Sequence, residues 1–323
     1  MPAIKDMLTI LLYVLIYPGF LFAGVAGLFL AGLDRKVLAR MQRRVGPPLI
    51  QPLYDFLKLL GKETIIPHNA NKLAYLGAPV IGTVSLSIMI LFIPLCGMTV
   101  TRFNGTADLI VLLYLLTIPG VAMIIGGAAS GSPFAGVGIS REMVTMMAYE
   151  LPLILVFLAV AKKVGGGSLC FSLGEIAAWQ GENGCLLFHW SMIPAALALL
   201  LVIPAEVGTQ PFDVAEAETE ICEGPLVEYS GAPLALFKLN GSLKMFVMTA
   251  LFTALFLGGI RLGNAAFLSG LVVLAIAAVI TLISMTLLHA VCARLKIEHL
   301  LKFYWTAVSG LALISLVLAW FGL

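Results

Sequence analysis

Residues 107–129 read 107-ADLIVLLYLLTIPGVAMIIGGAA-129, an apolar run whose single charged side chain is Asp108 near its start. An α-helix needs about 20 predominantly apolar residues to cross the hydrocarbon core of a bilayer, so this run is long enough. The run lacks the alternation of apolar and polar residues that a membrane β-barrel strand requires. It therefore predicts a transmembrane α-helix.

Runs of the same kind recur along the chain, which has 323 residues, of which 61% are hydrophobic and 11% charged. Its mean hydropathy of +1.06 is far above that of a soluble globular protein. No soluble domain, linker or internal repeat interrupts the pattern, so we expect one integral-membrane domain over residues 1–323, all-α, with about eight transmembrane helices. The expected spans are roughly 7–33, 74–98, 107–129, 142–163, 190–207, 241–260, 265–292 and 300–321.

The basic residues predict an orientation for these spans. The first apolar segment is too long for the core of a signal peptide and is expected to be retained. If the loop after it is cytoplasmic, fourteen of the nineteen Lys and Arg residues lie on the cytoplasmic side and five outside. Both termini are then external, and we expect a multi-pass protein of the plasma or inner membrane. The net charge of only +2 indicates no nucleic-acid partner.

The five cysteines do not predict a metal site, because they form no C-x-x-C and have no histidine at ligand spacing. Cys170 and Cys185 share one external loop and can pair if that side is oxidising; the alternative is isolated thiols. The chain also has no G-x-G-x-x-G after a strand. We therefore expect no cofactor bound by this chain, and any redox centre to lie in a partner.

Three stretches break the apolar pattern at the cytoplasmic side. The first is 34-DRKVLARMQRRVGPPLIQPLYDFLKLLGKE-63, where Gly46-Pro47-Pro48 ends a basic helical tail. After it, residues 49–63 place their apolar side chains on one face, which predicts an amphipathic helix in the plane of the interface. Two interpretations stay open: anchoring by positive charge alone, or a docking surface for a soluble partner.

The second stretch is 130-SGSPFAGVGISREMVTMMAYE-150. Its four glycines and Pro133 predict an irregular loop, after which Arg141 and Glu142 open the fourth span. Glu150 is then eight residues inside the span, about 12 Å along a helix. An ionisable group at that depth is either functional or part of a structural salt bridge, for example to Arg141.

The third stretch, 211-PFDVAEAETEICEGPLVEYSG-231, holds six carboxylates and no Lys or Arg, and Glu206 precedes it. Pro211 fits the start of a helix, on which Glu216, Glu220 and Glu223 would share one face. Like charges at this spacing repel one another and raise one another's pKa. The stretch is either an acidic surface loop, expected over about 208–240, or a proton or cation site.

Three groups of residues resemble a known family. The first loop contains Asp34-Arg35-Lys36, Gln42-Arg43-Arg44-Val45-Gly46-Pro47, Gln51-Pro52, Asp55-Phe56-Leu57-Lys58-Leu59 and Lys62-Glu63. The others are 149-YELP-152 in the middle of the chain, and then 211-PFD-213, 216-EAETE-220 and 228-EYSG-231. In this order they resemble the complex I membrane-arm subunit adjoining the quinone chamber, the NADH dehydrogenase subunit 1 family. The same motifs are found in its counterpart in membrane-bound group 4 nickel–iron hydrogenases.

Finer features look like the hydrogenase branch, which includes formate hydrogenlyase-type complexes. Gly46-Pro47-Pro48 runs almost directly into Gln51-Pro52, whereas complex I members usually carry a longer insert. The runs 131-GSPFAGVGISRE-142 and 223-EGPLVEYSG-231 also look like that branch, as does 238-KLNGSLK-244. The resemblance implies a subunit that anchors the soluble redox arm and couples electron transfer to translocation of H⁺ or Na⁺.

The resemblance also implies partners, cofactors and roles. The partners are hydrogenase-like large and small subunits, iron–sulfur subunits and antiporter-like membrane subunits, besides the bilayer. The nickel–iron centre and the iron–sulfur clusters lie in those partners. The implied coupling set is Glu142, Glu150, Glu206, Asp213, Glu216, Glu218, Glu220, Glu223 and Glu228, with Arg141, Lys238 and Lys244 as counter-charges. The implied docking set is Asp34, Arg35, Lys36, Gln42, Arg43, Arg44, Asp55, Lys58, Lys62 and Glu63.

Three other functions stay open at this point. The chain can be the quinone-site subunit of an NADH-quinone oxidoreductase, in which case a quinone binds beside it. It can be an independent cation-coupled secondary transporter, although the absence of an evident internal repeat is unfavourable to that class. It can also be a passive anchor whose acidic residues serve only assembly.

Overall fold

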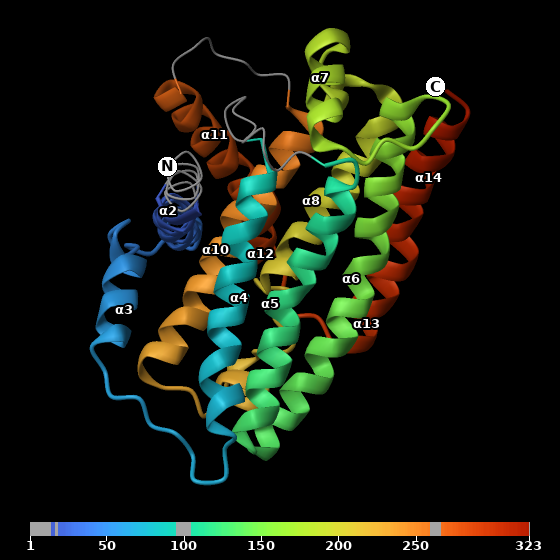
Figure 1. Ribbon diagram of the computed structural model, residues 1–323. Coiled ribbons are helices and arrows are strands. Elements are labelled where there is room, and N and C mark those ends of the chain that lie inside the picture. The colour runs from blue at the N-terminus through green and yellow to red at the C-terminus, as the bar shows by residue number, and fades with distance from the viewer. Residues whose placement is uncertain (1–13, 17–18, 95–104, 259–265, 323) are drawn as a thin grey trace, which may run out of the picture.

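The structure is a computed structural model that describes residues 14–16, 19–94, 105–258 and 266–322. Within these ranges the chain consists of helices, turns and loops, without a strand. The helices stand side by side as an elongated bundle, with the C-terminus near the end that carries α7 (Leu173–Asn183) (Figure 1). The expectation of an all-α membrane protein is confirmed.

Seven helical segments of the described residues are long and apolar enough to cross a membrane. Their bounds fall close to the second to eighth expected spans, and each differs from expectation mainly at its ends. They are α4 (Lys72–Phe92), α5 (Asp108–Ser130), α6 (Pro133–Gly165), Trp190–Val207, α10 (Gly231–Phe256), Val272–Val291 and Ile297–Trp320. Trp190–Val207 comprises η2 (Trp190–Met192) and α8 (Ile193–Val207), and it follows η1 (Leu186–Phe188).

The first expected span lies partly outside the described residues, and its described part is α2 (Phe20–Met41). Asp34, Arg35 and Lys36 fall in the second half of this helix, so it is less apolar than the seven others. The amphipathic segment expected at 49–63 contains α3 (Gln51–Leu60), with Pro52 in its first turn. α3 packs against both α2 and α10.

α10 is the central helix of the bundle, and it contacts α2, α3, α4, α7, α8 and α11. Most of its side chains are buried, from Phe237 to Phe256. Small residues let the neighbours approach it closely: a Cβ at Gly27 of α2 would collide with the backbone carbonyl of Ser242. A Cβ at Gly32 would likewise collide with the carbonyl of Leu49, so α2 is held between α10 and the segment before α3.

The glycine-rich segment after α5 is helical, which corrects the expected loop over 130–141. α5 ends at Gly131, whose φ of +71° is left-handed, and α6 begins two residues later with Pro133 in its first turn. The helix tolerates its glycines because Gly138 packs against Pro225, where a Cβ would come within 2.5 Å of the proline Cδ. Arg141 and Glu142 consequently lie in the third turn of α6 rather than at its start.

The acidic stretch is mostly irregular, which corrects the helix expected from Pro211. Only α9 (Glu218–Ile221) and the short η3 (Gly224–Leu226) are helical before Gly231 opens α10. Cys222 and Glu223 have positive φ angles of 51° and 68°, so no continuous helix passes through them. Repulsion between carboxylates at helical spacing disfavours that helix, and Gly224-Pro225 ends it.

The last two spans each contain a π-helical turn. One is built from α11 (Ala266–Thr281), η4 (Leu282–Thr286) and α12 (Leu287–Val291). The other is built from α13 (Ile297–Phe303), η5 (Tyr304–Val308) and α14 (Ser309–Trp320). Such turns bulge the helix and are frequent at functional sites. Here η4 brings Thr286 to α2, and η5 brings Tyr304 to α8, where its hydroxyl donates to the Leu201 carbonyl at 2.8 Å.

The loop around α7 holds two free thiols rather than a disulfide. Cys170 is buried and donates through Sγ to the Glu175 carboxylate at 2.9 Å, while Cys185 is half-buried and unpaired. Burial, together with the neighbouring carboxylate, raises the pKa of the Cys170 thiol, so the thiol stays protonated. Cys96 lies outside the described residues.

Candidate functional site

A cavity of about 450 Å³ lies between α2, α5, α6, α8, α10 and the acidic stretch. Its wall is unusually rich in acid for the interior of a membrane bundle. Six carboxylates line it: Asp34, Glu142, Glu206, Asp213, Glu216 and Glu223. We call this the acidic cavity.

Basic groups also face the acidic cavity and come from three different parts of the chain. They are Arg35 of α2, Lys238 and Lys244 of α10, His289 of α12 and Arg294, which precedes α13. Opposite charges in a water-accessible cavity partly offset the cost of removing each from bulk solvent. The cavity is therefore a mixed-charge site that can hold and exchange protons.

The deepest charges of the cavity are Lys244 and Glu206, with side-chain exposures of 9% and 2%. The Lys244 ammonium lies 3.1 Å from the Glu206 carboxylate and also donates to the backbone carbonyl of Glu206 at 3.0 Å. Pro204 and Gly208 end α8 here, which leaves that carbonyl near the helix terminus. The Tyr149 hydroxyl of α6 is a further hydrogen-bond partner of the Glu206 carboxylate.

Glu216 is a half-buried acid at the cavity wall, in the loop outside the membrane-spanning helices. Burial raises the pKa of Glu216 to about 7, and the charges of Glu142, Asp213 and Glu223 act in the same direction against that of Lys244. A carboxyl with this pKa exchanges its proton near neutral pH. Because its charge depends on the charges of its neighbours, the group titrates as a set.

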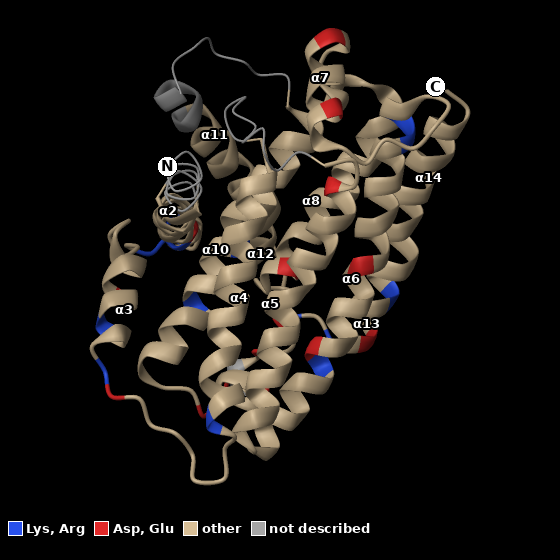
Figure 2. Ribbon diagram, in the orientation of Figure 1, with Lys and Arg blue, Asp and Glu red and all other residues tan. Residues whose placement is uncertain are grey.

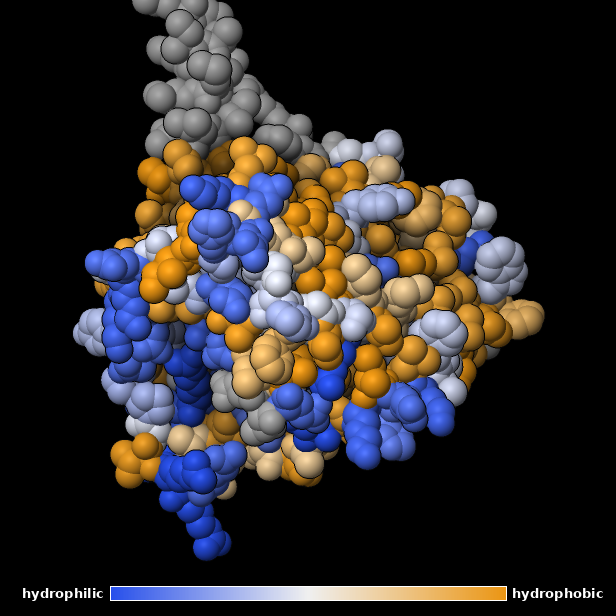
Figure 3. All heavy atoms as spheres, turned by 90° about the horizontal axis from the view of Figure 1, so that it is seen from below, coloured by the Kyte–Doolittle hydropathy of each residue, from blue (hydrophilic) through white to orange (hydrophobic). Residues whose placement is uncertain are grey.

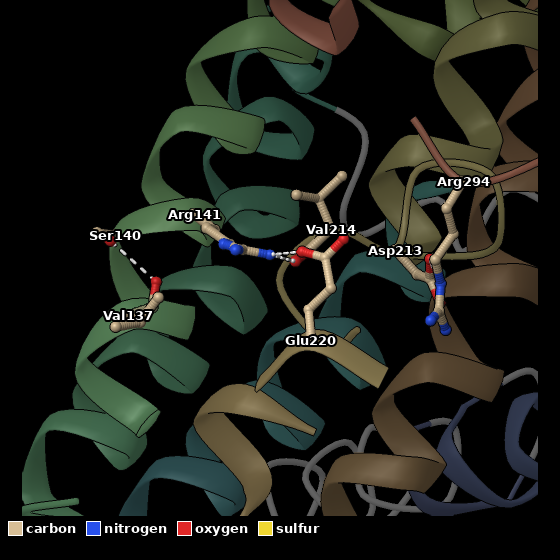
Figure 4. A network of polar contacts seen from close by, with 7 residues as sticks. All are labelled: Val137, Ser140, Arg141, Asp213, Val214, Glu220 and Arg294. Carbon is tan, nitrogen blue, oxygen red and sulfur yellow. Dashed lines mark hydrogen bonds and ion pairs between the residues drawn. The ribbon is translucent and has the colours of Figure 1, made fainter. Parts of the chain in front are cut away.

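Two arginines fasten the acidic stretch to the bundle at adjacent residues (Figure 4). Arg294 grips Asp213 with two parallel hydrogen bonds, 2.9 Å from Nε to Oδ1 and 2.8 Å from Nη2 to Oδ2. Leu295 adds a backbone hydrogen bond to the Pro211 carbonyl at 3.1 Å. Bidentate arginine–carboxylate pairs fix geometry as well as charge, so the segment before α13 sets the position of Asp213.

The second fastening comes from Arg141 of α6. Its guanidinium pairs with the Glu220 carboxylate and also reaches the Val214 backbone carbonyl at 3.4 Å (Figure 4). Glu220 is 55% exposed and points away from the acidic cavity. This pair therefore belongs to the anchoring of the stretch rather than to the cavity.

Asp34 lies in the wall of the acidic cavity and not on a docking surface. It is buried, with 8% exposure, and accepts a hydrogen bond of 2.6 Å from the Thr286 hydroxyl of η4. The π-helical turn thus joins α2 to the last third of the chain at a cavity residue.

The structure separates the other residues of the expected coupling set. Glu150 lies on α6 beyond Tyr149, half-buried and outside the cavity wall, and Glu228 is exposed. Glu218 falls in α9, and its side chain lies outside what the structure describes. Of the expected counter-charges, Lys244 pairs with Glu206 and Arg141 with Glu220, while Lys238 makes no ion pair with a described residue.

The expected docking residues are divided between an exposed tip and the flank of α3. Gln42, Arg43 and Arg44 are exposed next to Val45, which is 93% exposed; Lys36 is half-buried. Arg35 pairs with Asp55 at 2.9 Å, and Lys58, Lys62 and Glu63 are exposed. Charged residues gather in the half of the molecule away from α7 (Figure 2), and hydrophilic side chains cover much of that end (Figure 3).

Sequence reasoning missed the cavity roles of His289 and Arg294. Both lie at or just after the end of the seventh span, where basic residues were read only as a sign of orientation. The available signal was the π-helical turn and the short loop before α13, which bring this segment against Pro211 and Asp213.

Comparison with known proteins gives consistent matches over nearly the whole chain. The sequence model of the family described as NADH dehydrogenase matches residues 12–320. An NADH-quinone oxidoreductase membrane protein of Thermomicrobium roseum is 34% identical over 306 residues, or 89% of each chain. Hydrogenase-4 component C of Escherichia coli is 38% identical over 226 residues, or 70% of this chain and 69% of that one.

Among solved structures, a chain of the membrane-bound sulfane sulfur reductase, an archaeal respiratory membrane complex, has the same fold. Its TM-score is 0.87 at 32% sequence identity, and the match covers 96% of this chain and 99% of that chain. The similarity therefore includes every element that builds the acidic cavity.

Proposed function

Because the chain belongs to the NADH dehydrogenase family, we propose that it is a membrane subunit of an ion-translocating respiratory complex. In this role it anchors a soluble redox arm and couples electron transfer to translocation of H⁺ or Na⁺. The observation that carries the proposal is the buried Lys244–Glu206 pair at the inner end of a cavity lined by six carboxylates.

The geometry supports proton coupling by a connected series of groups. Glu216 and Glu142 lie at the cavity wall, Lys244 and Glu206 at its inner end, and Tyr149 bonds Glu206 next to Glu150 of α6. A change of charge or of loop position at the outer end alters the proton affinity of the next group. The mobile ion that suits this arrangement best is H⁺.

We propose that the soluble arm is of the nickel–iron hydrogenase type and docks through the exposed tip at Gln42, Arg43 and Arg44. Hydrogenase-4 component C supports this, since it is 38% identical to the chain, as does the likeness to the sulfane sulfur reductase chain. The redox centres would then lie in the partner subunits, which include iron–sulfur and antiporter-like proteins. We place the tip on the cytoplasmic side of the plasma membrane and both termini outside.

A second candidate is a quinone-reducing complex. The match to the NADH-quinone oxidoreductase protein of Thermomicrobium roseum over 89% of both chains favours it. The two candidates differ in the proteins that copurify with the chain: a nickel-binding large subunit in the first, an NADH-oxidising arm in the second.

The coupling role is tested in the purified complex reconstituted into vesicles, by measuring ions moved per pair of electrons. Glu142→Gln and Glu216→Gln each neutralise a cavity carboxylate, while Glu228→Gln neutralises an exposed one as the matched control. We expect the first two to lower the ratio while donor oxidation continues, and the control to leave it unchanged. Full stoichiometry in both cavity variants would refute the coupling role.

A further inference from the structure

A second cavity, of about 220 Å³, lies between α2, α3 and α10 beside the acidic cavity. Its apolar wall takes one stripe from each helix, because the lining residues recur at helical spacing on α2 and α3. These residues are Leu28, Ala31, Pro52, Phe56, Leu59 and Leu239. We call it the α3 cavity.

The polar part of the α3 cavity is strongly basic. It contains Arg35, Lys58, Lys62 and Lys238 against the single acid Asp55. Arg35 lies 2.9 Å from Asp55, whose other oxygen accepts from Gln51 at 3.0 Å, so that acid is already satisfied. Burial would raise the pKa of Asp55, but these bonds and the charges of Arg35 and Lys58 hold it below its usual range.

Three ammonium groups are therefore left over at this cavity. Lys58, Lys62 and Lys238 come from α3, from the loop after it and from α10, and none forms an ion pair with a described residue. They converge on one opening from separate parts of the chain. A ligand with a compact negative charge would complete them.

The site is a formed cavity and not a gap that α3 can close. The close contacts of Gly27 with Ser242 and of Gly32 with Leu49 fix α2 against α10 and against the start of α3. On its outer side α3 exposes Leu53, Leu57 and Leu60, at 37%, 54% and 43%. An amphipathic helix with such a face lies among acyl chains, so lipid has access to the cavity.

We propose that the α3 cavity binds an anionic glycerophospholipid, with its phosphodiester between the three lysines and an acyl chain along Phe56 and Leu239. Basic pockets between membrane helices suit such headgroups. A neutral occupant such as an isoprenoid quinone would fill the apolar wall but leave the three ammonium groups unpaired. The lipid would brace α2, the helix that carries Asp34 and Arg35, independently of which redox arm the complex uses.

The test measures lipid binding to the purified complex in nanodiscs made from phosphatidylglycerol and phosphatidylcholine, with retained lipid identified by mass spectrometry. The native complex should retain phosphatidylglycerol selectively. Each single Lys→Gln change at 58, 62 or 238 should weaken that binding about fivefold. The triple Lys→Gln variant should lose it, and the triple Lys→Arg variant should keep it.

The matched control is Lys72→Gln, Lys296→Gln and Lys302→Gln together, which removes the same charge from exposed lysines outside the α3 cavity. This control should bind phosphatidylglycerol like the native complex. Equal loss in the control, retention by the cavity triple variant, or a quinone instead of a phospholipid on the native complex would each overturn the proposal. Size-exclusion profiles of all variants confirm that the complexes compared are assembled.

Discussion

The Tyr229 hydroxyl donates a hydrogen bond to the backbone carbonyl of Tyr75 at 3.1 Å. The Tyr75 hydroxyl donates in return to the carbonyl of Glu228 at 2.7 Å, and the two rings stack with centroids 4.1 Å apart. The Tyr75 carbonyl needs this partner because Pro79, four residues later in α4, has no N–H to offer it. The end of the acidic stretch is thus latched to a kink in α4.

Tyr229→Phe removes the hydroxyl and leaves the Tyr75 carbonyl buried without a partner. An unsatisfied buried group costs about 1–3 kcal/mol, so we expect faster amide exchange in 226–231 and a lower melting temperature of the complex. Tyr54→Phe, at an exposed tyrosine of α3, is the matched control and should change neither. Equal exchange rates in the two variants would contradict the latch.

Lys244→Met should destabilise the subunit strongly, because it leaves Glu206 buried without its cation. Removing one partner of a buried pair costs about 3–5 kcal/mol, whereas removing both is often nearly neutral. We therefore expect Lys244→Met with Glu206→Gln to assemble better than Lys244→Met alone, measured as the yield of intact complex. The double variant should still fail to couple ion movement to electron transfer; normal coupling in it would exclude the pair from the pathway.

Glu216 gives a pH dependence with a defined sign. Its ordinary pKa is 4.5, and burial raises it to about 7. A carboxyl that binds its proton more tightly when folded adds stability that is complete below about pH 4.5 and is lost as the pH rises through about 7. In Glu216→Gln the side chain stays neutral, so stability should fall less between these pH values than in the native subunit.

The measurement for Glu216 is the melting temperature of the complex across that pH range, with Glu228→Gln as the control at an exposed acid. The control should reproduce the native pH profile. A Glu216→Gln profile that matches the native one as well would show that Glu216 does not titrate near neutral pH.

Sequence reasoning predicted what depends on local pattern. Long apolar runs determine the spans to within a few residues at most ends, since a helix must satisfy its own backbone in lipid. The pattern failed where tertiary contacts decide: glycines predicted a loop at 133–141, but Gly138 is a packing contact with Pro225 inside α6.

The site was predicted in its composition and not in its arrangement. Glu206 and Glu216 lie in the acidic cavity as the motif implied, yet Glu220, four residues after Glu216, faces outward to Arg141. Helical periodicity placed these two on one face, whereas the chain between them is irregular. Asp34 belongs to the cavity only because the π-helical turn η4 carries Thr286 to it, a contact across 252 positions that no local pattern contains.

Arg294→Lys tests whether the grip on Asp213 matters for the acidic cavity. Lysine keeps the charge but cannot form the two parallel hydrogen bonds, so the Asp213 segment should loosen by about 1–3 kcal/mol. We expect faster amide exchange at 211–214 and fewer ions moved per electron pair. Arg40→Lys, at an exposed arginine of α2, is the control and should behave like the native protein. If Arg294→Lys leaves both the exchange and the ratio unchanged, charge alone holds the stretch, and the bidentate geometry has no part in coupling.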